Sequence, residues 1–493
     1  MRASQRTDSI GRNAVFALAS ELATATFTAV ITIFLVRALD PAGYGVFVLA
    51  LGLAGLLAWP ADFGVSTSAA RFIAERRGDT AAVAAVLAKA LGLKLILTSL
   101  TALLLIALAE PIASLYGQPD LVWPLRAAAI ALFAQTFVFL FASTFVALGR
   151  TQWQFMLYLS EAAIEATATI GLVLLAGGAT AAVLGRAIGY CLGAIVGLVL
   201  VVRLLGRRSF TERRGAPRLR QLAGYAGAMM VIDSSYAVFA SLDVVLVGAL
   251  LGVTAAGIYA APVKIVALLH YPGLATANAV APRLARHPDH PPDVMALARG
   301  LRFLIILQVP IAVTIAVWAK PIVDLVLGST FEESADVLRA LAPLVLLQGF
   351  GPLASITVNY LGEARRRVPI VLGCLILNLS LLLVLVELVG VVGAAISVDI
   401  SYAVYVSAHL WICTRMIELR LRPLFWTGVR VIPGALALAA ILFALGADGL
   451  DLIEWIIGPP CGLAAFITLL VVTRELTLAE LREIPRLIVR GVR

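Results

Sequence analysis

The chain contains the stretch Leu39-Asp40-Pro41-Ala42-Gly43-Tyr44-Gly45-Val46-Phe47 and later a second version of it, Leu251-Gly252-Val253-Thr254-Ala255-Ala256-Gly257-Ile258-Tyr259. In each copy, residues typical of a turn are followed by an apolar run. Aligning the two copies pairs Gly45 with Gly257, Trp59-Pro60 with Tyr271-Pro272, and Arg71 with Arg283. A turn, a proline-interrupted apolar run and a closing arginine, repeated in one register, predict a chain built from two related halves.

The composition is typical of a membrane protein. Hydrophobic residues make up 61% of the 493 residues and charged residues only 14%, whereas a soluble domain carries about 25% charged residues. Apolar runs of about 20 residues, long enough to cross a bilayer as a helix, recur along the chain. We therefore predict an all-α, polytopic membrane protein and exclude a soluble globular fold.

The apolar runs predict about 14 transmembrane helices. Their expected cores are 13–36, 46–70, 83–109, 124–148, 156–176, 181–202, 222–250, 257–281, 301–319, 336–361, 369–388, 391–413, 428–446 and 453–472. We divide the chain into a six-helix N-terminal lobe (1–202), a basic cytoplasmic linker (203–220), a six-helix C-terminal lobe (221–415), and two additional helices with a basic cytoplasmic tail (416–493). Because six is even, both lobes start on the same side of the membrane, so the internal repeat is parallel.

The distribution of basic residues predicts how the chain is oriented. The net charge is +9, and most lysines and arginines fall in alternate connections between the predicted helices, which indicates the cytoplasmic side. Both termini are then expected to be cytoplasmic, and no nucleic-acid partner is expected. The four cysteines lie in apolar runs without a Cys-x-x-Cys pair, so we expect no metal site, no disulfide framework and no cofactor.

The stretch Arg37-Ala38-Leu39-Asp40-Pro41-Ala42-Gly43-Tyr44-Gly45-Val46-Phe47, followed by Asp62-Phe63-Gly64, resembles the opening of the polysaccharide transporter family. These are oligosaccharide flippases of the multidrug/oligosaccharidyl-lipid/polysaccharide (MOP) exporter superfamily. The resemblance implies two six-helix lobes around a central cavity and alternating access. It also implies a lipid-linked oligosaccharide of the undecaprenyl-diphosphate type as substrate. This lipid would be moved to the outer leaflet of a bacterial inner (plasma) membrane for lipopolysaccharide or exopolysaccharide synthesis. Partners would be membrane lipids and other polysaccharide export and polymerisation proteins.

Four basic residues inside the predicted helices are candidates for binding the substrate headgroup. A charge at the centre of a membrane helix costs ~2.5–3.5 kcal/mol on insertion scales, so each needs a reason to be there. A cationic side chain facing a watery cavity would offset the desolvation of a diphosphate. The candidates are Lys94, Arg186, Lys264 and Lys89. Lys89 could instead reach the inner headgroups, and Arg186, within a glycine stripe, could pair with an acid on a neighbouring helix.

The intramembrane acids are candidates for ion coupling. Glu161 and Glu165 are four residues apart and share a helix face, where two carboxylates repel unless a proton or cation lies between them. Glu21 opens a polar stripe that could line a cavity. The full set is Glu21, Glu161, Glu165, Asp233, Asp243 and Asp399. Location near the inner mouth, or local pairing of single acids, remains the alternative.

Pro60 and Pro272 interrupt equivalent runs in the two halves, and Asp62 follows the first of them. A proline inside a helix frees a carbonyl and bends the axis. Matched interruptions in the two halves point to the central site of a transporter. We therefore expect these three residues to take part in kinking and gating.

Other functions fit the residues less well. A drug/cation antiporter or a peptidoglycan lipid-precursor flippase would share the fold, although deep basic residues favour an anionic headgroup. A membrane glycosyltransferase or polymerase needs a catalytic acid on a substantial outer loop, and the predicted outer loops are short. No nucleophile–histidine–acid set is evident, so we expect no catalytic residues and no enzyme. A structural scaffold would tolerate loss of the intramembrane charges.

Overall fold

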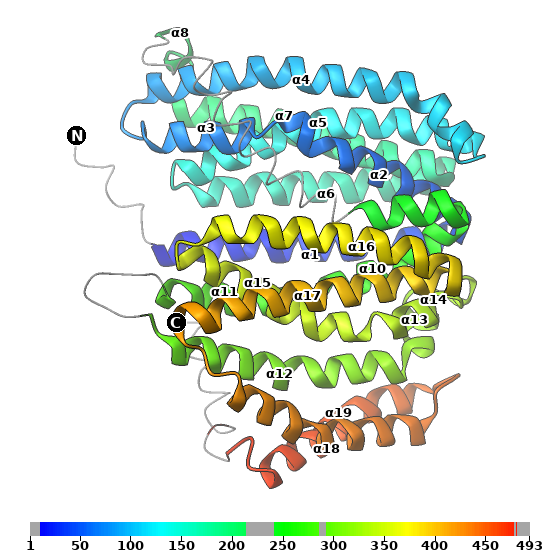
Figure 1. Ribbon diagram of the computed structural model, residues 1–493. Helices are drawn as coiled ribbons and strands as arrows, with labels where there is room; N and C mark the ends of the chain where they lie inside the picture. The colour runs from blue at the N-terminus through cyan, green and yellow to red at the C-terminus, as the bar shows by residue number, and fades with distance from the viewer. Residues whose placement is uncertain (1–9, 213–240, 285–291, 478–479, 481–493) are drawn as a thin grey trace. The chain divides into compact units, whose positions relative to one another are not determined.

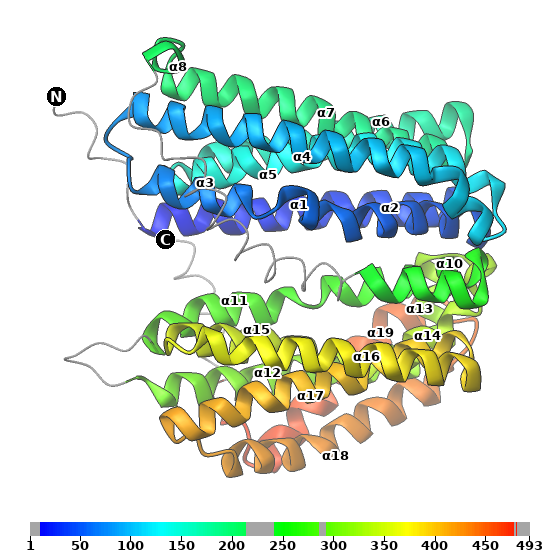
Figure 2. The ribbon, with the colours of Figure 1, turned by 45° about the horizontal axis from the view of Figure 1, so that its top comes forward.

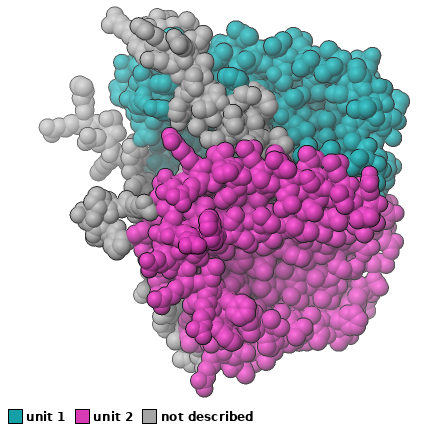
Figure 3. Space-filling model, viewed as in Figure 1, with its two compact units in different colours: residues 1–260 teal, residues 261–493 magenta. Residues whose placement is uncertain are grey.

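The computed structural model describes residues 10–212, 241–284, 292–477 and 480, and every regular element in these ranges is a helix (Figure 1). The chain divides into two compact units, residues 1–260 and 261–493, which Figure 3 shows in different colours. The all-α prediction is confirmed. The two units are treated separately below.

Unit 1 consists of long helices that run side by side (Figures 1 and 2). They are α1 (Ile10–Ala38), α2 (Pro41–Asp62), α3 (Val65–Ala74), α4 (Thr80–Leu115), α5 (Val122–Ala147), α6 (Thr151–Ala176), α7 (Gly178–Leu205), the short α8 (Ser209–Glu212), a helix over Ser241–Leu251, and the start of α10 (Val253–Leu268). The most extensive packing is between α6 and α7 and between α5 and α7. The α6–α7 interface holds one of the two polar clusters described below.

Unit 2 contains a second set of long helices with shorter ones between them (Figure 2). After the end of α10 come α11 (Tyr271–Val280), α12 (Val294–Val317), α13 (Ala319–Val326), α14 (Ser334–Ala340), α15 (Ala342–Tyr360), α16 (Arg367–Val389), α17 (Val391–Ile417), α18 (Arg422–Leu445) and α19 (Leu452–Val472). The last two pack against each other, and both contact α12.

Thirteen helical segments in the described residues are long and apolar enough to cross a membrane. The chain is therefore a multi-pass membrane protein. The predicted span 222–250 lies mostly outside the described residues, which contain only its last part as the helix Ser241–Leu251. The predicted linker 203–220 is likewise described only to residue 212. The predicted division into lobes at that linker stays a prediction. The boundary between the two compact units falls after residue 260 of the chain.

The two copies of the repeated stretch contact each other inside unit 1. The missing Cβ of Gly45 leaves room for the backbone carbonyl of Val253, and that of Gly257 leaves room for the carbonyl of Pro41. A side chain at either glycine would overlap the facing backbone. Each glycine of the repeat thus admits the backbone of the other copy, which is how small residues bring helices close.

The predicted span 46–70 is broken into α2 and α3. Phe63 and Gly64 at the break have φ values of 48° and 66°, in the left-handed region that ends a helix. In the second half the break falls at Leu269-His270, between α10 and α11. Pro60 therefore precedes its break, whereas Pro272 follows its own, as the second residue of α11. The side chain of Pro60 is outside the described part of the structure, and the gating roles stay predictions.

Candidate functional site

The break between α2 and α3 holds a buried ion pair. Asp62 is 6% exposed, Ser66 6% and Lys94 of α4 0%. Lys94 Nζ donates to Asp62 Oδ1 and, at 2.7 Å, to Ser66 Oγ. Asp62 also accepts from the Ser66 backbone N–H at 3.1 Å and from the Ser66 hydroxyl at 2.7 Å. The carboxylate thus satisfies a helix N-terminus and a buried ammonium at once.

A second cluster lies between α6 and α7. Glu165 Oε1 accepts from Arg186 Nη1 at 2.9 Å. Arg186 Nη2 donates to Tyr190 Oη at 3.1 Å, and Gln135 Nε2 of α5 donates to the same hydroxyl at 3.1 Å. Glu161 is 5% exposed, and within the described residues its Oε1 is buried without a hydrogen-bond partner. The structure therefore brings together three predicted residues that the sequence assigned to two different sets.

The glycine face of α7 makes this cluster possible. A Cβ on Gly189 would lie 2.6 Å from Glu165 Cβ, and one on Gly193 would lie 2.7 Å from Glu161 Cγ. Both values are closer than non-bonded carbon atoms approach. Because these positions are glycine, α6 packs directly on α7, and both glutamate stems lie in the interface.

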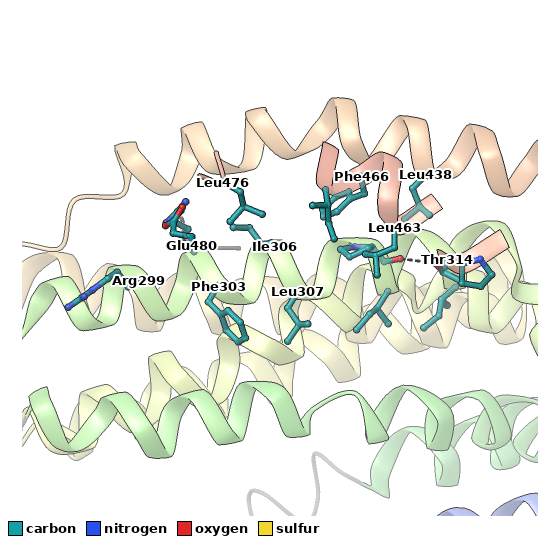
Figure 4. Close-up of a pocket in the computed structure, with 16 residues that line it drawn as sticks. Arg299, Phe303, Ile306, Leu307, Thr314, Leu438, Leu463, Phe466, Leu476 and Glu480 are labelled. Atoms are coloured by element: carbon teal, nitrogen blue, oxygen red, sulfur yellow. Dashed lines mark hydrogen bonds and ion pairs between the residues drawn. The ribbon is translucent and has the colours of Figure 1, made fainter. Parts of the chain in front are cut away.

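A large groove lies in unit 2, between α12 on one side and α18 and α19 on the other. Its volume is about 910 Å³. Figure 4 shows Phe303, Ile306 and Leu307 along α12, with Leu438, Leu463 and Phe466 across the groove. Arg299, Arg302 and Glu480 lie among its lining residues and give it a polar end. No sequence motif predicted this groove.

The segment that follows α19 contacts the polar end of the groove. The buried Glu475 accepts from Arg302 Nε at 2.7 Å, from Thr427 at 2.8 Å and from Arg430 at 3.3 Å. Arg302 also donates to Glu480 Oε1 at 2.9 Å, and this hydrogen bond lowers the pKa of Glu480 to about 2. Arg302 and Glu475 are far apart in sequence, so only the folded chain shows the pairing.

The remaining predicted residues do not join these clusters. Lys89, Lys264 and Glu21 are exposed, and Asp243 is buried. Asp399 is partly buried, and its Oδ1 has no hydrogen-bond partner in the described part of the chain. Asp233 lies outside the described residues. The headgroup and coupling roles of all these residues stay predictions.

The family can be assigned from a match over more than half of the chain. Residues 10–287 match the family described as polysaccharide biosynthesis protein. The chain belongs to this family. The match includes the Leu39–Phe47 turn, its repeat and both polar clusters of unit 1. The predicted resemblance to polysaccharide transporters is confirmed.

Two further likenesses extend over nearly the whole chain. A relative in Haloferax volcanii, described as a probable low-salt glycan biosynthesis flippase, Agl15, is 23% identical over 469 residues, with 92% of this chain and 94% of the relative covered. The lipid II flippase MurJ in an inward closed conformation superposes with a TM-score of 0.73 at 11% identity, covering 94% and 99% of the two chains.

A multidrug resistance MATE transporter of the MOP superfamily, in an inward-facing conformation, superposes with a TM-score of 0.62 at 16% identity. The superposition covers 80% of this chain and 95% of that one. At such identities these two structures show the fold alone. The chain therefore shares the fold of these two transporters.

Proposed function

We propose that this protein is a flippase that moves a lipid-diphosphate-linked oligosaccharide from the cytoplasmic to the outer leaflet by alternating access, driven by an ion gradient. The family match and the flippase named among its relatives support this proposal. The observation that carries it is the groove of unit 2, which is apolar along its length and basic at one end. That is the shape and polarity of a long lipid chain with an anionic headgroup.

The dimensions of the groove fit such a lipid. Its lining follows α12 from Arg299 to Thr314, which corresponds to about 22 Å of helix. Apolar side chains line both walls, so an isoprenoid chain lying there would be removed from contact with polar groups. In the described part of the chain Arg299 has no ion-pair partner, and its guanidinium is exposed. A diphosphate at this end would find a cation not already paired.

The cationic residues of the predicted headgroup set differ in their exposure. Lys264 and Lys89 are exposed, and each already takes part in an interaction. Lys94 is fully buried against Asp62, and Arg186 holds Glu165, so either would bind a diphosphate only after its ion pair opened. We assign first contact with the headgroup to Arg299, at one end of the groove of unit 2. In this proposal the chain transports without catalysing a reaction.

The test is a flipping assay with groove-filling variants. The full chain would be reconstituted in liposomes with a fluorescent undecaprenyl-diphosphate-linked oligosaccharide, and accessibility of the glycan to an external reagent would be followed. Leu463→Trp and Ile311→Trp fill the groove and should slow flipping by about tenfold, the effect of about 1.4 kcal/mol. Leu436→Trp is the matched control, because Leu436 is 64% exposed on α18 and does not line the groove. Equal rates for all three variants would refute the role of the groove.

A flippase for the peptidoglycan lipid precursor is the second candidate, since the lipid part of that substrate would fit the same groove. The two are separated by competition in the same liposomes. Unlabelled lipid II should leave flipping of the oligosaccharide lipid unchanged if the first proposal holds. Preferential flipping of lipid II would favour the second candidate.

A further inference from the structure

Among the described residues, the cluster between α6 and α7 contains two acids and one base. Glu161 and Glu165 lie on one face of α6, and Arg186 interacts electrostatically with both. Two ionised carboxylates beside one guanidinium would leave a net charge of −1 in a buried place. An uncompensated buried charge is strongly unfavourable. The cluster therefore needs one more positive charge to be neutral.

The hydrogen bonds indicate which acid lacks its partner. Arg186 uses one nitrogen for Glu165 and another for Tyr190, and Gln135 holds the Tyr190 hydroxyl from α5. Glu161 receives no hydrogen bond from Arg186 in the described residues, and its buried Oε1 has no partner there. The Glu165 carboxyl group lies on the same face of α6, one helical turn away. Two carboxylates that both lack a proton have no donor between them, so a hydrogen bond from Glu161 to Glu165 would require a proton on Glu161.

The surroundings favour a proton over a metal cation. Among the described residues no three histidine, cysteine or acidic side chains lie close enough together to bind a metal ion. From α1 the nearby acid is the exposed Glu21. It interacts electrostatically with Tyr158 of α6, as Glu161 also does. From α7 the groups are Arg186 and Tyr190, and α5 contributes the uncharged Gln135. A proton needs only the two carboxyl oxygens, whereas hard cations such as Ca²⁺ and Mg²⁺ take about six oxygen ligands.

We infer that Glu161 is a proton-binding residue and that its proton is the coupling ion of the transporter. Loading transfers a proton from water to the Glu161 carboxylate, which then donates a hydrogen bond to Glu165 while Glu165 accepts from Arg186. The loaded cluster is neutral and suits the close α6–α7 contact. Releasing the proton to water leaves a net negative charge, which is tolerated only if water enters the interface and α6 separates from α7. Proton release is thereby tied to a change in helix packing.

This inference rests on the proposed flippase function, so its test has two independent readouts. The first is infrared difference spectroscopy of the purified full chain during pH steps, without any lipid substrate. We expect a protonated-carboxyl band that disappears at high pH, is lost in Glu161→Gln and returns in Glu161→Asp. Glu110→Gln is the matched control, because Glu110 also faces an arginine, Arg126 at 2.7 Å, but its side chain is 70% exposed. An unchanged band in Glu161→Gln would overturn the inference.

The second readout is flipping of the fluorescent lipid-linked oligosaccharide under an imposed pH gradient. One pH unit changes the proton activity tenfold, so we expect a gradient of one unit to change the wild-type rate by up to about tenfold relative to no gradient. Glu161→Gln should flip at a rate independent of the gradient, and Glu161→Asp should keep the dependence. Flipping that follows a sodium gradient and ignores pH would overturn the inference but leave the flippase proposal intact. If no lipid is flipped under any condition, the flippase proposal fails, and the infrared titration alone decides whether Glu161 binds a proton.

Discussion

Unit 1 holds two buried clusters of charge that differ in their balance. At the break between α2 and α3 one acid, Asp62, meets one base, Lys94, and Ser66 completes the hydrogen bonds. Between α6 and α7 two acids meet one base, and in the described residues one carboxyl oxygen is left without a partner. A balanced cluster is stable as it stands. An unbalanced one must acquire or release an ion, which is what a coupled transporter requires.

The same contrast separates a structural role from a functional one. Asp62 ties the start of α3 to α4 across a backbone break with two positive φ values. Its partners are all used, so nothing remains to bind a ligand. The pair Glu161 and Glu165 on α6 differs, because in the described residues Glu161 Oε1 has no hydrogen-bond partner. We therefore expect changes at the first cluster to affect folding most, and changes at the second to affect pH dependence most.

The largest effect on stability is expected for Lys94→Ala. It leaves Asp62 buried without its cation, and removing one partner of a buried pair costs about 3–5 kcal/mol. Thermal unfolding in detergent should show a markedly lower midpoint. The double variant Lys94→Met/Asp62→Asn removes both charges and should recover much of the loss. A midpoint equal to wild type in Lys94→Ala would contradict a structural role for the pair.

A smaller loss is expected for Glu165→Gln. Arg186 then keeps a neutral acceptor, and its partly buried charge is balanced within the cluster only if Glu161 ionises. Losing a charged hydrogen-bond partner costs about 1–3 kcal/mol. Glu161→Gln should cost less, because glutamine imitates the protonated acid in shape and charge. Unfolding midpoints measured side by side check this order, and a greater loss in Glu161→Gln would place the proton on Glu165 instead.

A similar or smaller effect is expected for Gly189→Ala, which tests how closely the helices must pack. The new methyl group would meet Glu165 Cβ at 2.6 Å, and such overpacking costs about 1–3 kcal/mol. The expected result is a lower unfolding midpoint together with a shifted pH dependence of the carboxyl band. Gly171→Ala on α6 is the control, since no atom lies within 4 Å of its added Cβ. Equal midpoints for the two variants would show that α6 and α7 need not approach so closely.

The smallest effect is expected where a charge pair is exposed. The pKa of Glu480 is lowered to about 2 from an ordinary value of 4.5, mainly by its hydrogen bond with Arg302. A lowered pKa stabilises the folded state above pH 4.5, and that contribution is lost as the pH falls through about 2. Because the Glu480 side chain is 42% exposed, the contribution should be below about 1 kcal/mol. The difference in midpoint between wild type and Glu480→Gln, followed from pH 7 downward, should vanish near pH 2.

Much of the fold follows from the pattern of apolar and polar residues along the sequence. The length and polarity of the apolar runs predicted the helices, because only helices satisfy the backbone of a single segment in hydrocarbon. The repeated turn also identified Gly45 and Gly257, which admit each other's backbone. The break at Phe63-Gly64 was misjudged as part of one span, because the apolar run continues through it while only the backbone angles reveal the interruption.

By itself the sequence determined the class of the protein, its repeat, and the list of charged residues that need a reason to lie inside a membrane. It also put Glu161 and Glu165 on one helix face, since a spacing of four is local geometry. The tertiary structure decided which of those charges neutralise one another. Lys94 meets Asp62, Arg186 meets Glu165, and Arg302 meets Glu475. Such pairings depend on how separate helices pack, and helix packing is set by side-chain shape over long sequence distances.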